Sequence, residues 1–238
     1  MVLKKHAYLI VSAILLTMFI VFTVLVKTVD VEYIYSGTYL GFHALNFKVC
    51  SWVVQFGKYD QFKTISDVLL YLAIGYSAVL GVCGIIQLIK TKSFKKVNKD
   101  FYILLGGYIA VALTYLIFEI TKVNYSPDST VEELKASYPS SHVFVGCSLY
   151  LLNSFTAVKL LNPEKKWISY LIFASTGLIC VLTTFTRLMT IKHWLTDIIA
   201  SVILVAALFT LYLYSYRQIN ESKEENIDGQ EQPKENNQ

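Results

Sequence analysis

Two short segments of the chain carry residue types that suit phosphate chemistry. In the later one, Arg187, His193 and Asp197 are separated by five and then three residues. His193 and Asp197, four positions apart, would share one face of a helix. A carboxylate placed there can hold one ring nitrogen of a histidine and leave the other free as nucleophile or base. The planar guanidinium of Arg187 fits phosphate oxygens.

The earlier segment reads Tyr-Pro-Ser-Ser-His at 138–142. Pro139 followed by two serines is typical of a helix start, with a serine as the N-cap. The unpaired N–H groups of a first helical turn form an anion site, and His142 in that turn could give a proton to a leaving oxygen. Together, the two segments predict phosphoryl transfer through a phosphohistidine, with no metal or other cofactor.

A simpler interpretation of the same residues stays open. Charged side chains at the ends of membrane helices also serve as interfacial anchors, and Arg187, His193 and Asp197 would fit that role. His6 and His43 have no such neighbours, and we interpret them as structural. Glu119 is ambiguous, because an intramembrane carboxylate is often functional but can also reach the interface.

The elements that must position these segments are predicted to be transmembrane helices. The 238 residues are 55% hydrophobic and 16% charged, with a mean hydropathy of +0.50. The apolar residues gather in blocks of about 20, the length that crosses a bilayer core. We therefore expect an all-α, integral membrane bundle of six transmembrane helices, with spans at 7–26, 66–89, 102–121, 142–160, 167–185 and 195–214. All four prolines lie outside these spans.

The basic residues predict the orientation of the bundle. On a six-span topology, four basic segments fall on one side, at 4–5, 90–99, 159–166 and 217. The positive-inside rule makes that side cytoplasmic, together with both termini. The two chemical segments then lie on the extracytoplasmic side.

The chain divides into three predicted regions. Residues 1–65 hold the first span and a long extracytoplasmic loop that forms a short interfacial helix or a packed loop. Residues 66–214 form the transmembrane core, and 215–238 form a disordered polar cytoplasmic tail. The four cysteines show no C-x-x-C spacing, so we expect neither a disulfide framework nor a zinc site. The formal charge of +4 belongs to membrane loops and does not indicate nucleic-acid binding.

The motifs resemble those of the type 2 phosphatidic acid phosphatase superfamily, integral-membrane enzymes recognised by K-x6-R-P, P-S-G-H and S-R-x5-H-x3-D. The resemblance covers about residues 66–214, and the stretch Ala-Ser-Tyr-Pro-Ser-Ser-His at 136–142 is similar to a bacterial subgroup of small proteins. It implies that His193 attacks phosphorus with Asp197 as its partner, and that His142 protonates the leaving group. The phosphate ligands implied are Arg187, Ser140 and the backbone at Ser141.

The chain departs from the family pattern in three places. Ser141 replaces the glycine of the second motif, and Thr186 replaces the serine of the third. In the first motif, alignment on Pro127 places Ser126 where the family has arginine. Lys122 lies nearby and is a candidate phosphate ligand, although the motif does not assign it that role.

The leading hypothesis is a plasma-membrane lipid phosphate phosphatase with an extracytoplasmic site. Its substrate would be a polyprenyl diphosphate, phosphatidic acid or phosphatidylglycerophosphate. Two alternatives stay open: a non-catalytic membrane protein that binds a lipid phosphate, and a lipid phosphotransferase in which a hydroxyl replaces water as acceptor. The sequence does not decide the substrate or the oligomeric state.

Overall fold

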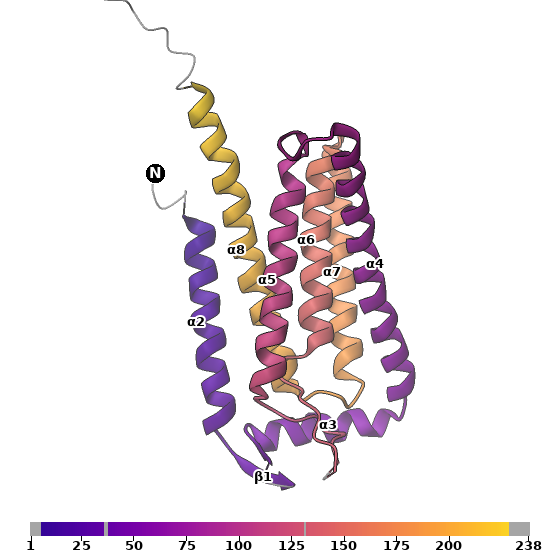
Figure 1. Ribbon diagram of the computed structural model, residues 1–238. Helices are drawn as coiled ribbons and strands as arrows, with labels where there is room; N and C mark the ends of the chain where they lie inside the picture. Colours follow the sequence, from indigo (N-terminus) through magenta and orange to yellow (C-terminus); the bar gives the residue numbers. More distant parts are fainter. Residues whose placement is uncertain (1–5, 36–37, 131, 229–238) are drawn as a thin grey trace, which may run out of the picture.

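Six long helices run side by side in the computed structural model (Figure 1), which describes residues 6–35, 38–130 and 132–228. Each is long and apolar enough to cross a membrane, and the protein is a multi-pass integral membrane protein. A helix satisfies its own backbone hydrogen bonds, which is why apolar blocks of this length become helices in lipid. They are α2 (Ala7–Thr28), α4 (Tyr59–Thr91), α5 (Lys99–Thr121), α6 (Ser141–Leu161), α7 (Lys166–Leu188) and α8 (Leu195–Asp228).

Helix α6 is the central helix of the bundle. The most apolar stretch of α6 is more deeply buried than that of any of the other five spans, because α4, α5, α7 and α8 all pack against it. Its polar side chains find partners on these neighbours: Asn153 Nδ2 donates to Ser77 Oγ at 2.9 Å, and the hydroxyls of Thr156 and Tyr212 lie 2.9 Å apart. Protein contacts therefore cover most of α6, the helix whose first turn holds His142.

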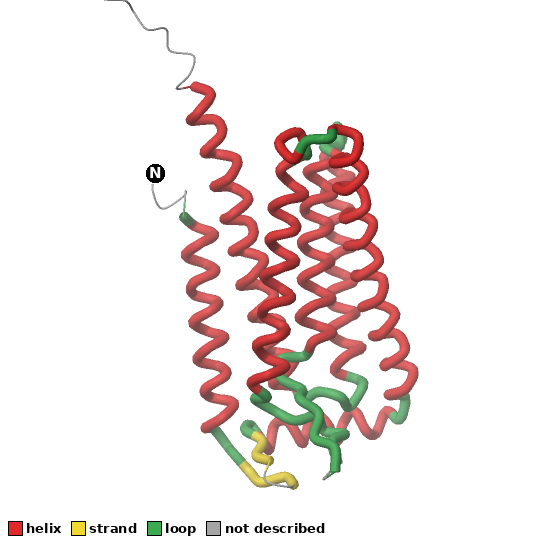
Figure 2. Tube along the Cα trace, in the orientation of Figure 1, coloured by secondary structure: helices red, strands yellow, loops and turns green. Residues whose placement is uncertain are grey.

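The long segment between α2 and α4 folds over one end of the bundle. It contains an antiparallel hairpin, β1 (Glu32–Tyr35) and β2 (Thr38–Leu40), followed by α3 (His43–Phe56), which lies across the ends of the spans (Figure 1). The longer loops gather at this same end (Figure 2). A short 3₁₀ helix, η1 (Phe94–Lys96), belongs to the tight connection at the opposite end. We call the two ends the α3 end and the η1 end.

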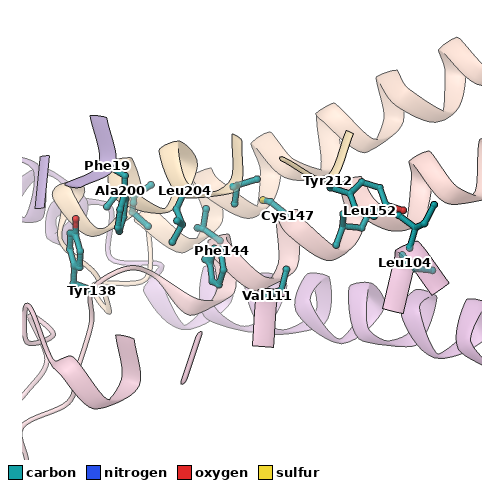
Figure 3. Close-up of a cluster of buried hydrophobic side chains, with 14 of the residues drawn as sticks. Phe19, Leu104, Val111, Tyr138, Phe144, Cys147, Leu152, Ala200, Leu204 and Tyr212 are labelled. Atoms are coloured by element: carbon teal, nitrogen blue, oxygen red, sulfur yellow. The ribbon is translucent and has the colours of Figure 1, made fainter. Parts of the chain in front are cut away.

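The main hydrophobic core joins α2 and α8 to the centre of the bundle. Phe19 of α2, Tyr138 before α6, and Phe144 of α6 belong to one buried cluster with Leu204 of α8 (Figure 3). The ring centroids of Phe19 and Tyr138 are 6.2 Å apart, and the Thr23 and Tyr138 hydroxyls are 2.6 Å apart. The residue that precedes Pro139 is thereby fixed against α2.

Two helices are longer than the sequence predicted. Helix α4 begins at Tyr59 rather than near 66, because a more polar segment, 59–65, continues the apolar helix beyond the predicted span. Helix α8 continues to Asp228, into the segment 215–238 for which the sequence predicted disorder. Residues 229–238 lie outside the described residues, as do Lys4 and Lys5, which entered the orientation argument.

Candidate active site

His193 lies in the short loop between α7 and α8, at the α3 end of the bundle. Its ring is buried, and Nδ1 lies 2.8 Å from the backbone oxygen of Ser137. A carbonyl oxygen can only accept, so Nδ1 carries the proton and Nε2 presents its lone pair. Within the described residues, Nε2 is buried with no hydrogen-bond partner. Burial lowers the pKa of His193, an effect that Asp197 opposes, so the ring stays neutral at neutral pH.

Asp197 lies 3.8 Å from Nδ1 of His193, at ion-pair distance but beyond a hydrogen bond. Its carboxylate is fully buried and has two other partners: the N–H of Trp194 donates to Oδ2 at 3.0 Å, and Asn124 Nδ2 donates to Oδ1 at 3.1 Å. Because Trp194 directly precedes α8, Asp197 closes the first turn of that helix in the manner of a capping box. The sequence predicted that the Asp197 carboxylate orients the His193 imidazole. In the structure the backbone oxygen of Ser137 holds the ring instead.

Backbone contacts join the two segments. The N–H of Ser140 points to the backbone carbonyl oxygen of Asp197 at 3.4 Å. Ser201 Oγ donates to the backbone carbonyl oxygen of Ser140 at 3.2 Å. Ser140 is the N-cap of α6, as expected, but its hydroxyl makes no cap hydrogen bond and is buried without a partner in the described structure. Ser141 and His193 line one small pocket together. The start of α6 is therefore placed beside the free nitrogen of His193.

His142 contacts an acidic residue that the sequence reasoning did not select. Its Nε2 lies 2.9 Å from Oδ1 of Asp67, on α4, and Nη1 of Arg187 lies 4.0 Å from the same oxygen. Lys63, one turn earlier on α4, lies 3.9 Å from the other carboxylate oxygen. One sequence signal could have identified Asp67: it is an acidic residue in the first turn of a predicted span, where a charge is costly.

Several buried polar atoms at this site have no partner among the described residues. They include Nδ1 of His142, Nε of Arg187, Nε2 of His193 and the hydroxyl of Ser140. Buried polar groups are nearly always hydrogen-bonded, so such a concentration is unusual. Of these, Nε of Arg187 and the Ser140 hydroxyl are donors that can bind an anionic oxygen, whereas the unprotonated Nε2 of His193 is a potential nucleophile.

The residues of the degenerate first motif lie in the loop that follows α5. Lys122 ends that helix with a left-handed backbone and is exposed, and no hydrogen bond or ion pair in the described chain joins it to the site. Ser126 is buried, with its hydroxyl 2.6 Å from the oxygen of Lys192, and it also contacts Asp128. Lys192 pairs with Asp128. Burial acts to raise the pKa of Asp128, but these hydrogen bonds outweigh it and lower the pKa.

Glu119 and His43, which the sequence analysis also considered, differ in their position relative to this cluster. Glu119 of α5 is exposed at the pocket lined by Ser141 and His193. His43 pairs with Glu32 at 3.2 Å, beside the hairpin. The structure thus brings together His193, His142, Asp197, Arg187 and the two serines, and it leaves Lys122 outside.

Comparison with known proteins places the chain in a family. Residues 101–221 match the family described as the PAP2 superfamily. A search of curated proteins found no match. Among solved structures, the chain is similar to one titled as the first transmembrane PAP2 type phosphatidylglycerolphosphate phosphatase from Bacillus subtilis. The TM-score is 0.65 with 16% identity, covering 87% of this chain and 96% of that one.

Proposed function

The chain belongs to the PAP2 superfamily, and on that premise we propose that it hydrolyses a phosphate or diphosphate monoester of a lipid through a phosphohistidine on His193. One observation carries the proposal: Nε2 of His193 is buried, unprotonated and unpartnered while Ser137 holds Nδ1. A neutral imidazole held in this way is an activated nucleophile. The matched family and the lipid-phosphate enzyme of similar fold both support a lipid phosphate as the substrate class.

The proposed reaction has two steps. Nε2 of His193 attacks the terminal phosphorus, and the bond from that phosphorus to the leaving oxygen breaks. The leaving oxygen is the lipid alcohol oxygen of a monophosphate or the bridging oxygen of a diphosphate, and His142 gives it a proton. Water then attacks the phosphohistidine, giving inorganic phosphate and restoring free His193. Arg187, Ser140 and the first-turn N–H groups of α6, near Ser141, stabilise the phosphoryl oxygens.

The proposed orientation puts this site on the extracytoplasmic face of the plasma membrane. The described basic residues of 90–99, 159–166 and 217 belong to the η1 end, opposite the site. Under the positive-inside rule that end faces the cytoplasm. Polyprenyl diphosphates, phosphatidic acid and phosphatidylglycerophosphate would then present their phosphates to the α3 end while their tails stay in the bilayer.

A phosphate-release panel tests the proposal. Purified protein in detergent is given each of these lipids in the presence of a metal chelator, with His193→Ala as the blank and His43→Ala as the matched histidine control. We expect release by the wild type and the control, and a loss of at least about 10³-fold in His193→Ala, as for other nucleophile deletions. Full activity in His193→Ala, or activity abolished by the chelator, would overturn the mechanism.

One observation favours a second function, binding without turnover. The motif arginine is replaced by Ser126, whose buried hydroxyl is engaged with the Lys192 backbone, and exposed Lys122 makes no described contact with the site. A charge-assisted hydrogen bond is worth about 1.5–3 kcal/mol, so its loss could slow turnover by roughly one to two orders of magnitude. Lipid binding that is unchanged in His193→Ala, with no phosphate released by the wild type, would support a binding protein. Product analysis with added alcohols separates hydrolysis from phosphotransfer.

A further inference from the structure

The carboxylate of Asp67 lies among the cationic groups of the site. Its Oδ1 is 2.9 Å from Nε2 of His142 and 4.0 Å from Nη1 of Arg187, and its side chain is 29% exposed. Helix α4 supplies it, whereas the two motif segments lie on α6 and around the start of α8. Asp67 therefore adds a third element, and a negative charge, to a site otherwise suited to an anion.

The hydrogen bond between His142 and Asp67 determines which nitrogen of the His142 ring carries a proton. A carboxylate at neutral pH only accepts, so Nε2 of His142 must be the protonated nitrogen that donates. Nδ1 is buried and has no partner in the described structure. A neutral ring in this arrangement has no proton to give except the one already bonded to Asp67. A proton on Nδ1 is available to the leaving oxygen only when the ring is charged.

We propose that Asp67 is a positioning residue that holds the His142 ring through Nε2–H and stabilises its charged form, so that Nδ1–H faces the leaving oxygen. This inference rests on the proposed function. As the bond from phosphorus to oxygen breaks, Nδ1 gives its proton to the lipid oxygen, which leaves as an alcohol. The ring becomes neutral with Nε2–H still bonded to Asp67, and the water that attacks the phosphohistidine returns a proton to Nδ1.

Charges on the surrounding elements explain why such a partner is needed. Arg187 of α7 is a cation whose Nη1 lies 4.0 Å from the same Asp67 oxygen that His142 contacts, so it disfavours a second positive charge on the ring. Lys63 of α4 lies 3.9 Å from Oδ2 of Asp67, the carboxylate oxygen that does not contact the His142 ring. Asp67 is the negatively charged group in direct contact with His142, with its Oδ1 2.9 Å from Nε2.

The test separates this role from simple packing by comparing leaving groups. Asp67→Asn keeps the size of the side chain and removes its charge, and Asp60→Asn removes a matched charge from an exposed position earlier on α4. Each protein is assayed on a lipid phosphate, whose alcohol leaves poorly, and on p-nitrophenyl phosphate, whose leaving group needs no proton. General acid catalysis contributes about 10²–10⁴-fold, so we expect Asp67→Asn to lose roughly 10–100-fold in kcat on the lipid. On the nitrophenyl ester we expect little loss, and the Asp60→Asn variant should match the wild type on both.

The pH profile and a direct titration complete the experiment. In Asp67→Asn the basic limb of kcat on the lipid should move to lower pH by about one unit, the order of a lost ion-pair partner. The chain has four histidines, so labelled histidine followed by NMR should show the same downward movement for the His142 titration midpoint. Equal losses on both substrates with an unmoved midpoint would overturn the inference. Increased activity of Asp67→Asn would also overturn it, because the Asp67 carboxylate would then be competing with the substrate phosphate for the cationic groups of the site. A wild type that releases no phosphate overturns the proposed function instead, and the NMR titration still decides the pairing.

Discussion

Replacing Asn46 by alanine tests whether α3 holds the catalytic end of α8. Asn46 is completely buried, and its side-chain nitrogen donates to the oxygen of Gly41 at 2.9 Å and to the Thr196 hydroxyl at 3.1 Å. Its Oδ1 accepts from the N–H of Thr196 at 3.2 Å. Asn46 on α3 thus caps the first turn of α8 at Thr196, which lies 150 positions later in the chain and three residues after His193.

The cost of the substitution follows from the groups left without partners. Loss of a helix N-cap costs about 1 kcal/mol, and a buried carbonyl such as that of Gly41 left unpaired costs about 1–3 kcal/mol. The expected loss of unfolding free energy is therefore about 2–4 kcal/mol. Phe47, next to Asn46, packs on Trp194 with ring centroids 5.4 Å apart. The loop that carries His193 should then shift, and a displacement of about 1 Å can cost roughly 100-fold in turnover.

The matched control is Asn98→Ala at the η1 end. Asn98 caps α5 within its own segment, accepting from the N–H of Asp100 at 3.0 Å. This variant should lose about 1 kcal/mol of stability and keep the wild-type kcat. Both variants are measured by thermal unfolding in detergent and by phosphate release. If Asn46→Ala melts and turns over like Asn98→Ala, then α3 does not hold the site and the reasoning is refuted.

Three further predictions rest on single features of the structure. Burial lowers the pKa of His193, so its imidazole stays neutral on mild acidification. The acid limb of the kcat/KM profile should therefore have its midpoint below about 6.5, the ordinary pKa of a histidine. A midpoint above that value would contradict the buried environment. A Cβ at Gly41 would lie 1.9 Å from the backbone oxygen of Val26, so Gly41→Ala should melt well below Gly177→Ala, where the space is open. Ser126→Arg should lose about 1–3 kcal/mol of stability through overpacking of a buried site without a gain in phosphate release, and increased release would show that the motif arginine can still be accommodated.

Local spacing was enough to predict the helices and to select the candidate site residues. A helix in lipid must satisfy its own backbone, so the length and hydropathy of each block directly predicted six spans. The start of α6 at Ser141 followed from the proline and serines before it. The four-residue spacing also placed Asp197 near His193, at 3.8 Å.

The partners of those residues were decided by tertiary structure. His193 is oriented by the backbone of Ser137, 56 positions away, and any residue type offers a carbonyl oxygen, so the sequence carries no signal for that bond. His142 meets Asp67 across 75 positions because α4 packs against α6. The boundaries of α4 and α8 likewise exceeded the apolar blocks, since helices can continue beyond the membrane core. Sequence therefore determined which groups are available for the chemistry, and the packing of distant helices decided their protonation and direction.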